Sequence, residues 1–281
     1  PELTALLQSD DFSRAIDIPS PVMSTGWLNC RVVPYGADQK LVIVRDVTER
    51  ITLNKIRRDF VANASHELRS PLTVISGYLE TLTDDPQVPE DLIAPLSQMQ
   101  SQARRMNAIV KDLLELSRLE GEGQAPLEET VSIAAVIANA IEAVSAGRNV
   151  APISSRIESE AALLGAESEI DSILRNLLTN AARHTPEDGT IDVIWRSDDE
   201  GADLIVRDSG EGIAPEHIPR LTERFFRVDR GRARGEGGFG LGLAIVKHAV
   251  ERHGGELLVE SEPGQGSEFR CRFPASRLLY K

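Results

Sequence analysis

The chain has 281 residues, enough for on the order of two or three compact units, and 41% of them are hydrophobic, an ordinary share for globular protein. Its 31 basic and 44 acidic residues give a formal net charge of −13, which argues against sequence-independent binding of nucleic acid. No run of about 18 apolar residues is present, so no segment is expected to span a membrane. The chain begins at Pro1 rather than at methionine, and we expect a fragment whose membrane segment lies upstream.

Cysteine use points to a reducing compartment. The two cysteines, Cys30 and Cys271, sit far apart in strand-like stretches, so we expect both to be reduced and buried. The sequence contains no Cys-x-x-Cys pair, and a zinc site is therefore not expected.

The first 46 residues are loop-rich and then strand-like. Two strands are predicted, Trp27 to Val33 and Lys40 to Arg45, joined through a turn that contains glycine. This stretch is too short for a complete sensory domain. A hairpin that only caps the following helix explains it equally well at this point.

From Val47 onward the apolar residues take the spacing of a helix. The segment "TDDPQVPED" interrupts the pattern with two prolines, and a second helix then runs to the linker "LEGEGQAP". In both helices the apolar residues recur in steps of four and three, which is typical of a helix that packs against another. They are Ile56, Phe60, Ala64, Leu68, Leu72, Ile75, Leu79 and Leu82 in the first helix and Leu92, Leu96, Met99, Ala103, Met106, Val110 and Leu113 in the second.

Two such helices joined by a short loop form an antiparallel hairpin. One hairpin cannot bury both apolar seams well, so two copies are expected to associate as a four-helix bundle. The sequence therefore predicts a homodimer.

Residues from Leu127 to the end alternate between helix and strand patterns. This alternation predicts an α/β sandwich in which one mixed sheet is covered on one face. The predicted helices are Ser132 to Ala146, Glu167 to His184 and Leu241 to His253, and the predicted strands lie near Ile153 and Ala162 and in "TIDVIWRS", "ADLIVRDSG", "GELLVES" and "SEFRCRF".

Two asparagines, Asn176 and Asn180, lie one turn apart on one face of a predicted helix. Asparagine is a poor helix former, so a pair on an otherwise apolar helix calls for an explanation. Their amide oxygens suit Mg²⁺, a hard cation that takes oxygen ligands and accompanies phosphates. Taken alone, the pair also fits two exposed polar residues.

Two glycine-containing segments follow along the chain. In "DSGEGI", directly after a strand, Asp208 can accept a hydrogen bond from an exocyclic amine, although the segment also fits a simple turn. The segment "GEGGFGLGLAIVKH" leads into a helix whose N-terminal N–H groups suit phosphate, yet it matches neither a Walker loop nor a Rossmann turn. The arginines that precede it, from Arg224 to Arg234, suit a lid over a polyphosphate or else a solvated flexible loop.

Together, and in this order, the three clusters resemble the ATP-binding domain of sensor histidine kinases, which has the GHKL type of α/β sandwich. The resemblance extends to "ERFFRV" and "SEPGQGSEF" and covers residues 50 to 275. It implies that Asn180 is the chief Mg²⁺ ligand and that Asp208 reads the adenine amino group. The other ATP-binding residues that it implies are Asn176, Arg183, His184, Gly210, Gly212, Ile213, Arg227, Gly238, Gly240, Leu241, Gly242 and Leu243.

The segment "SHELRSPL" resembles the phosphoacceptor motif of the same family, with His66 as the nucleophile. His66 is two residues from both Ala64 and Leu68, which places it opposite the apolar seam and exposed to solvent. An exposed imidazole has a pKa of about 6.5, so it is mostly neutral at neutral pH. Glu67 can orient the ring or take its proton. Because Pro71 lacks an N–H, a bend is expected just past the histidine. Taken alone, His66 would be an ordinary surface histidine.

One position departs from the family pattern. The family usually has threonine where this chain has Ser70, and that residue helps to position water for dephosphorylating the partner. Serine keeps the hydroxyl, so phosphatase activity is expected to remain. Within the family the chain resembles membrane-bound sensors of the phosphate-regulon type, because "LVIVRDVTER" looks like the last strand and exit of a PAS domain.

We therefore expect the C-terminal part of a PAS-like sensor domain in residues 1–46, a dimerisation and histidine phosphotransfer hairpin in 47–121, and a catalytic ATP-binding domain in 122–281. The expected activity is that of a two-component histidine autokinase. It phosphorylates His66 from ATP with Mg²⁺, transfers the phosphoryl group to an Asp of a response-regulator receiver domain and serves phosphate-starvation signalling. The expected location is the cytoplasmic portion of a bacterial inner-membrane sensor, bound to the membrane only through segments absent from this chain.

Two other interpretations compete with the kinase. One is a related ATPase in which nucleotide drives conformational change without a phosphohistidine, and the intact motif around His66 argues against it. The other is a non-catalytic dimer scaffold, which predicts degenerate Asn and Gly clusters, whereas here both clusters are intact.

Overall fold

The computed structural model describes residues 15–23, 25–35, 39–85, 88–121, 125–126, 129–146, 150–228 and 239–280. Within the first long helix it leaves out the side chains of Asn54, Arg57, Arg58, Phe60, Ala62 and His66. The chain divides into two compact units, Pro1–Asn63 and Ala64–Lys281.

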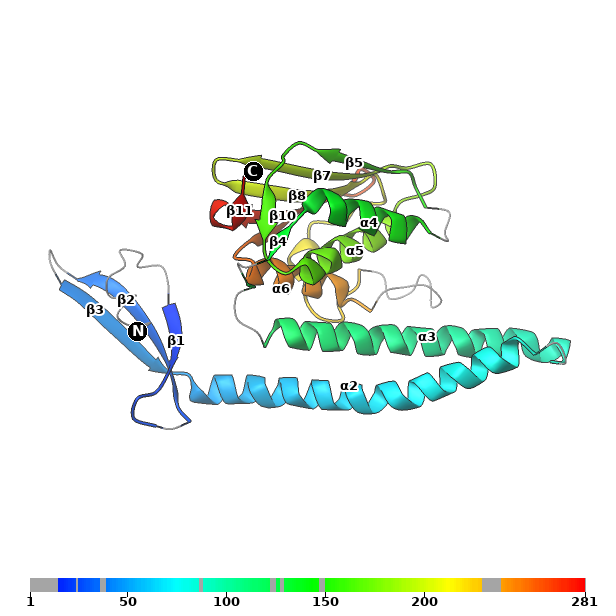
Figure 1. Ribbon diagram of the computed structural model, residues 1–281, viewed down its shortest axis with the longest axis horizontal. Helices are drawn as coiled ribbons and strands as arrows, with labels where there is room; N and C mark the ends of the chain where they lie inside the picture. The colour runs from blue at the N-terminus through cyan, green and yellow to red at the C-terminus, as the bar shows by residue number, and fades with distance from the viewer. Residues whose placement is uncertain are drawn as a thin grey trace. The chain divides into compact units, whose positions relative to one another are not determined.

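The first unit contains a three-stranded antiparallel sheet in the order β1-β2-β3 (Figure 1). Its strands are β1 (Ala15–Pro19), β2 (Trp27–Tyr35) and β3 (Gln39–Asp46). A small core forms around the buried side chains of Cys30 and Val32. The two predicted strands are present. The additional strand β1 is not predicted, because it has only five residues, too short an Ile-Asp-Ile alternation to mark a strand, and it ends in proline.

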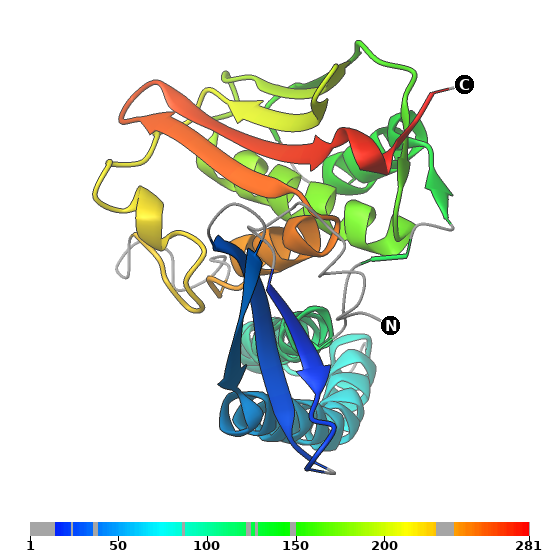
Figure 2. The ribbon, with the colours of Figure 1, turned by 90° about the vertical axis from the view of Figure 1, so that its left-hand side faces the viewer.

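Helix α2 (Thr48–Thr83) and helix α3 (Glu90–Leu119) are long, as predicted, and in the second unit α3 runs beside the second half of α2 (Figures 1 and 2). The Nδ2 atom of Asn107 on α3 lies 3.4 Å from the Oγ atom of Ser76 on α2. Helix α2 continues through Pro71 without ending, and it curves over its second half (Figure 1).

The apolar stripe of each helix separates into two columns with a seven-residue step. One column is buried or half-buried within the hairpin, and the other stays exposed. The inward columns are Ser65, Leu72 and Leu79 on α2 and Leu96, Ala103 and Val110 on α3; the exposed columns are Leu68, Ile75 and Leu82 on α2 and Leu92, Met99 and Met106 on α3. A single hairpin thus leaves half of its apolar positions without a core.

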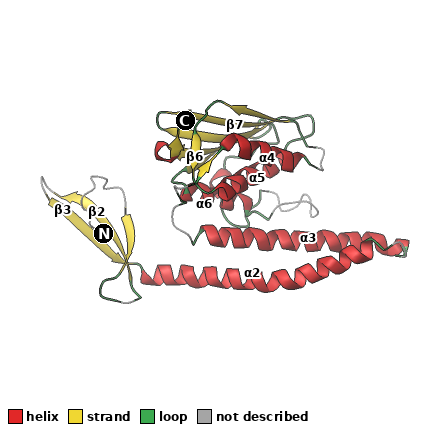
Figure 3. Ribbon diagram, viewed as in Figure 1, coloured by secondary structure: helices red, strands yellow, loops and turns green. Residues whose placement is uncertain are grey.

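The C-terminal part of the second unit is an α/β sandwich, which confirms the predicted fold (Figure 3). Its mixed sheet has the order β5-β7-β8-β10-β9, in which only β5 and β7 pair in parallel. Helices α4, α5 and α6 all cover one face of this sheet (Figures 1 and 2). The elements are α4 (Ile133–Ser145), β5 (Ile153–Ile157), α5 (Glu167–His184), β7 (Ile191–Asp198), β8 (Gly201–Asp208), α6 (Gly242–Arg252), β9 (Glu256–Glu262) and β10 (Gly266–Pro274).

Short elements complete the sandwich. A small sheet in the order β11-β6-β4 joins β4 (Thr130–Val131), β6 (Ala162–Leu164) and β11 (Leu278–Leu279). Two short 3₁₀ helices are η1 (Ile218–Arg220) and η2 (Ala275–Arg277).

The core of the sandwich extends into helix α3. Leu116 and Leu119, near the end of α3, are 2% exposed and belong to the same apolar cluster as Ile170 of α5 and Ile245 of α6. Both cysteines are free and buried, as predicted, and burial raises the pKa of the Cys271 thiol far above its usual range. Of the helices that the structure describes, none has the length and apolar character needed to cross a membrane.

A buried charge cluster holds α3, α5 and α6 together. The carboxylate of Glu169 is 1% exposed and lies 3.2 Å from the Arg118 guanidinium and 3.1 Å from the Nε of Arg252. Beside it, His253 is fully buried: its Nδ1 lies 2.7 Å from the Ala249 carbonyl, and its Nε2 accepts the N–H of Ala166 at 3.2 Å. One ring nitrogen donates and the other accepts, so this site fits the neutral imidazole.

Stability should therefore fall in mild acid because of His253. Burial lowers the pKa of His253 in the folded protein, so below about pH 6.5 the unfolded chain binds a proton that the folded chain does not. The free energy of unfolding should drop by up to about 1.4 kcal/mol per pH unit. Urea denaturation between pH 8 and pH 5.5 measures this dependence.

A His253→Gln variant is the matched control for this experiment. It should be less stable at pH 8 but should show a shallower loss toward pH 5.5. Asp112, whose pKa burial raises to about 6, works in the opposite direction in both proteins and cancels in the comparison. Equal pH dependence in the two proteins would contradict the assignment.

Candidate active site

Helix α5 carries four of the predicted site residues. Its first turn contains Glu167 and Glu169 and its last turn Arg183 and His184, charges that complement the helix dipole. The half-buried Asn180 lies one turn after Asn176 on this helix. The helix thus presents an amide oxygen and a basic end near the edge of the sheet.

Asn176 fits α5 closely against the start of α6. Its Nδ2 donates to the carbonyl of Ser172 at 2.9 Å, which leaves its Oδ1 facing Gly242. A Cβ atom at Gly242 would lie 2.6 Å from that oxygen, so a side chain there would displace the Asn176 amide. Asn176 and Gly242 are thus closely packed where α5 meets the start of α6.

Strand β8 ends at Asp208, which is 6% exposed. Its Oδ1 accepts the N–H of Gly210 at 2.9 Å. Burial raises the pKa of Asp208, and the N–H groups of Gly210 and Ser267 partly offset that rise. A carboxylate held in this way can accept a further hydrogen bond in a fixed direction, as the recognition of an exocyclic amine requires.

The loop after Asp208 is packed tightly against neighbouring backbone. Gly212 has a φ of 69°, and a Cβ atom there would lie 2.0 Å from the carbonyl oxygen of Glu262. Ile213 follows in the same loop and is half-buried against the core. At the other side of the loop, the N–H of Glu211 donates to the carbonyl of His184 at 3.3 Å.

The start of helix α6 lies next to this loop region. Leu241 is buried, and the helix proper begins at Gly242 and continues through Leu243. The carbonyl of Gly240 accepts the N–H of Phe225, a residue with an unusual φ of 62°. Free N–H groups at a helix start suit phosphate oxygens. Arg227 is half-buried and lies before this segment, while Gly238 and the predicted lid arginines Arg230, Arg232 and Arg234 lie outside the described residues.

The predicted phosphoacceptor residues lie on α2, a separate element. Glu67 and Ser70 are exposed, whereas Ser65 is buried within the hairpin. The side chain of His66 lies outside the described residues, so its exposure stays a prediction. The hydroxyl of Thr73 donates to the carbonyl of Arg69, one turn back, at 2.9 Å. The carbonyl that loses its helix donor at Pro71 is that of Glu67.

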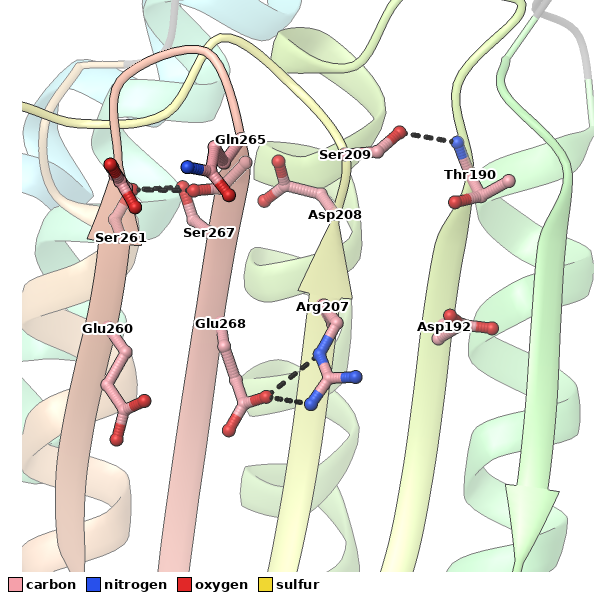
Figure 4. A pocket seen from close by; sticks show the side chains of 12 residues that line it. Thr190, Asp192, Arg207, Asp208, Ser209, Glu260, Ser261, Gln265, Ser267 and Glu268 are labelled. Carbon is pink, nitrogen blue, oxygen red and sulfur yellow. Dashed lines mark hydrogen bonds and ion pairs between the residues drawn. The ribbon is translucent and has the colours of Figure 1, made fainter.

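Three neighbours of Asp208 were not predicted as site residues. Glu211 lies 2.8 Å from the Nδ1 of His184, and Ser261 and Ser267 share a 2.9 Å hydrogen bond beside the strand end. Asp208, Ser261 and Ser267 are among the polar side chains that line a pocket of about 440 Å³ at this end of the strands. Figure 4 shows these side chains. Glu211 lies in the segment "DSGEGI", and both serines lie in "SEPGQGSEF", but neither segment indicated a role for these three residues.

Two protein families match this chain. The family described as "His Kinase A (phospho-acceptor) domain" matches residues 56–122. The family described as "Histidine kinase-, DNA gyrase B-, and HSP90-like ATPase" matches residues 165–277. The first match contains the helical hairpin, and the second contains α5, the Asp208 loop and α6.

Curated relatives and solved structures agree with these matches. The chain is 44% identical to the phosphate regulon sensor protein PhoR of Pseudomonas aeruginosa PAO1, over 99% of this chain and 63% of that protein. It is 33% identical to the sensor protein SrrB of Staphylococcus aureus N315, over 90% of this chain and 44% of that protein. The chain thus spans less than two thirds of either relative. The crystal structure of full-length ShkA in complex with AMPPNP covers 77% of this chain at 27% identity with a TM-score of 0.66, and 45% of that chain is matched.

The contact between Gly212 and Glu262 gives a test of the nucleotide pocket. Gly212→Ala should weaken ATP binding by at least about tenfold, because the new methyl group meets a backbone oxygen and the loop must move. Titration with a fluorescent ATP analogue measures this loss.

Gly254→Ala is the matched control. Gly254 also has a positive φ, 71°, but its Cβ position makes only an ordinary contact, 3.7 Å from the side chain of Pro274. Both variants therefore carry similar backbone strain, and only Gly212→Ala adds the collision. Equal losses of ATP affinity would show that strain alone, not the shape of the Asp208 loop, determines binding.

Proposed function

We propose that this chain, which belongs to the sensor histidine kinases of two-component systems, transfers the γ-phosphoryl group of ATP to His66 and then to an Asp of a response-regulator receiver domain. The observation that carries this proposal is that one chain contains both the buried, hydrogen-bonded Asp208 in its glycine-shaped loop and the helix segment around His66. A plain ATPase needs only the first of these.

The first step is attack by a ring nitrogen of His66 on the γ-phosphorus. A nitrogen–phosphorus bond forms, the bond from phosphorus to the bridging oxygen breaks, and ADP leaves with that electron pair. Glu67, adjacent on an exposed face of α2, orients the imidazole or takes its proton. In the second step a carboxylate of the receiver domain attacks the phosphoramidate and regenerates the histidine.

The nucleotide is held by the second group of residues. Asp208 accepts a hydrogen bond from the adenine amine, and the start of α6 directs N–H groups at the phosphates. Asn180 fits Mg²⁺ because its amide oxygen is a hard donor, with phosphate oxygens and water left to complete the shell. When bound, Mg²⁺ would neutralise charge that develops on the transferring phosphoryl group.

Dephosphorylation of the receiver domain by water is assigned to Ser70. It lies one turn after His66 on the same helix and is exposed, so its hydroxyl can place water against a phosphorylated receiver domain. We also infer phosphate-starvation signalling as the process, supported by 44% identity to the phosphate regulon sensor protein of Pseudomonas aeruginosa. By similarity to that sensor, we also propose that the chain is the cytoplasmic portion of a bacterial inner-membrane sensor.

The helical hairpin is proposed to form a homodimer. Its exposed columns present leucine, isoleucine and methionine side chains that are 46–55% exposed in one chain, including Ile75 at 47% and Met99 at 55%. Packing the columns of two hairpins together gives a four-helix bundle with a continuous apolar core.

His66→Gln tests the phosphoacceptor. It should bind ATP with unchanged affinity but take up no label from γ-labelled ATP, because the nucleophile is gone while the nucleotide pocket is intact. Asn180→Ala should also take up no label, but through loss of Mg²⁺-dependent nucleotide binding. Acid-labile label remaining on the His66→Gln protein would refute the assignment, and ATP turnover by the unaltered protein without such label would favour a plain ATPase.

Met99→Glu tests the dimer. A carboxylate in the exposed apolar column should turn the protein into a monomer, and light scattering after gel filtration should show the mass fall by about half. Ser101→Glu is the matched control, since position 101 points roughly away from that column on the same helix. A dimer that survives Met99→Glu would contradict the proposed interface.

A further inference from the structure

One hydroxyl ties the Asp208 loop to the turn between β9 and β10. Ser261, near the end of β9, is half-buried, and its Oγ accepts the N–H of Ile213 at 2.8 Å. The same oxygen lies 2.8 Å from the Gly266 carbonyl, to which it donates. A single side chain therefore joins two loops that are about fifty residues apart in the sequence.

Backbone contacts surround this hydroxyl. The N–H of Gly264 donates to the carbonyl of Glu211 at 2.8 Å, so the loop and the turn are joined at two points. Between these points Gly212 packs directly against Glu262. The turn between β9 and β10 thus fixes the position of the Asp208 loop, and the contact leaves no room for even one added methyl group at Gly212.

The same turn reaches the carboxylate that the nucleotide is proposed to contact. Ser267 pairs with Asp208 across β10 and β8, and its backbone N–H partly offsets the rise that burial causes in the pKa of the Asp208 carboxylate. The Oγ of Ser267 lies 2.9 Å from the Oγ of Ser261, and Figure 4 shows both serines beside Asp208 at the end of the strands. A Cβ atom at Gly266 would lie 1.9 Å from the Asp208 carbonyl oxygen, so the backbone approaches too closely here for any side chain.

We propose that Ser261 is a positioning residue that sets the Asp208 carboxylate for recognition of the adenine amino group. The inference rests on the proposed function of the site and adds a residue to it. Because hydrogen-bond recognition depends on direction, a loop released from Ser261 should lose discrimination against a base that lacks the amine. A purely structural serine would affect all nucleotides equally.

The test compares ATP with ITP, which has a carbonyl where adenine has its amine. Both nucleotides compete with a fluorescent ATP analogue for the unaltered protein and for Ser261→Ala. We expect Ser261→Ala to raise the Kd for ATP about tenfold and the Kd for ITP less than about twofold. Ser261→Thr, which keeps the hydroxyl, should restore the preference for ATP. Ser276→Ala, at an exposed position of η2, is the matched control for a serine-to-alanine change away from the site and should leave both Kd values unchanged.

Each outcome is decisive. If the unaltered protein prefers ATP and Ser261→Ala keeps the full preference, the inference is wrong, while the proposed function stands. Equal weakening of both nucleotides, or a Ser261→Thr protein that behaves like Ser261→Ala, would also overturn it. If the unaltered protein itself does not prefer ATP, the proposed recognition of adenine by Asp208 fails, and with it this inference, whereas transfer of the phosphoryl group to His66 is tested separately by labelling. Urea midpoints of all variants separate loss of selectivity from loss of folding.

Discussion

The hydrogen-bonded burial of one carboxylate is the constraint around which the proposed nucleotide site is built. A buried carboxylate must be satisfied by donors: Asp208 accepts the N–H of Gly210, and the N–H of Ser267 also offsets the rise of its pKa on burial. Those donors belong to the following loop and to the facing hairpin, so both must approach closely. The glycines in these two segments follow from that closeness.

The helical hairpin follows a different rule, since its apolar residues outnumber the positions that a single chain can bury. Splitting each stripe into an inner and an outer column gives the hairpin enough contact to form and leaves enough apolar surface to require a partner. In the proposed dimer, α2 would carry both a part of the interface and the phosphoacceptor His66.

Much of the fold was visible in the sequence, because periodicity reports which side of an element is buried. The sandwich, its helices and the long hairpin were predicted from apolar spacing, and α5 has the bounds expected for it. The sequence does not predict strand β1, because an alternation confined to five residues that end in proline is too short to mark a strand. The two columns of α2 look like one stripe in the sequence, because the steps of four and three from Leu68 to Leu72, Ile75 and Leu79 pass back and forth between them. The part of Ser261 could not be predicted at all, because it depends on a turn meeting a loop that is distant in the chain.

The participation of α3 in the sandwich core changes where the two domains can be said to separate. The glycine-rich linker that follows the helix marks a boundary in the sequence, but Leu116 and Leu119 already belong to the core beyond it, and Arg118 holds the buried Glu169. The end of the hairpin is therefore a structural part of the ATP-binding domain. A rotation of α3 about its own axis would therefore move the side chains that pack on α5 and α6 directly.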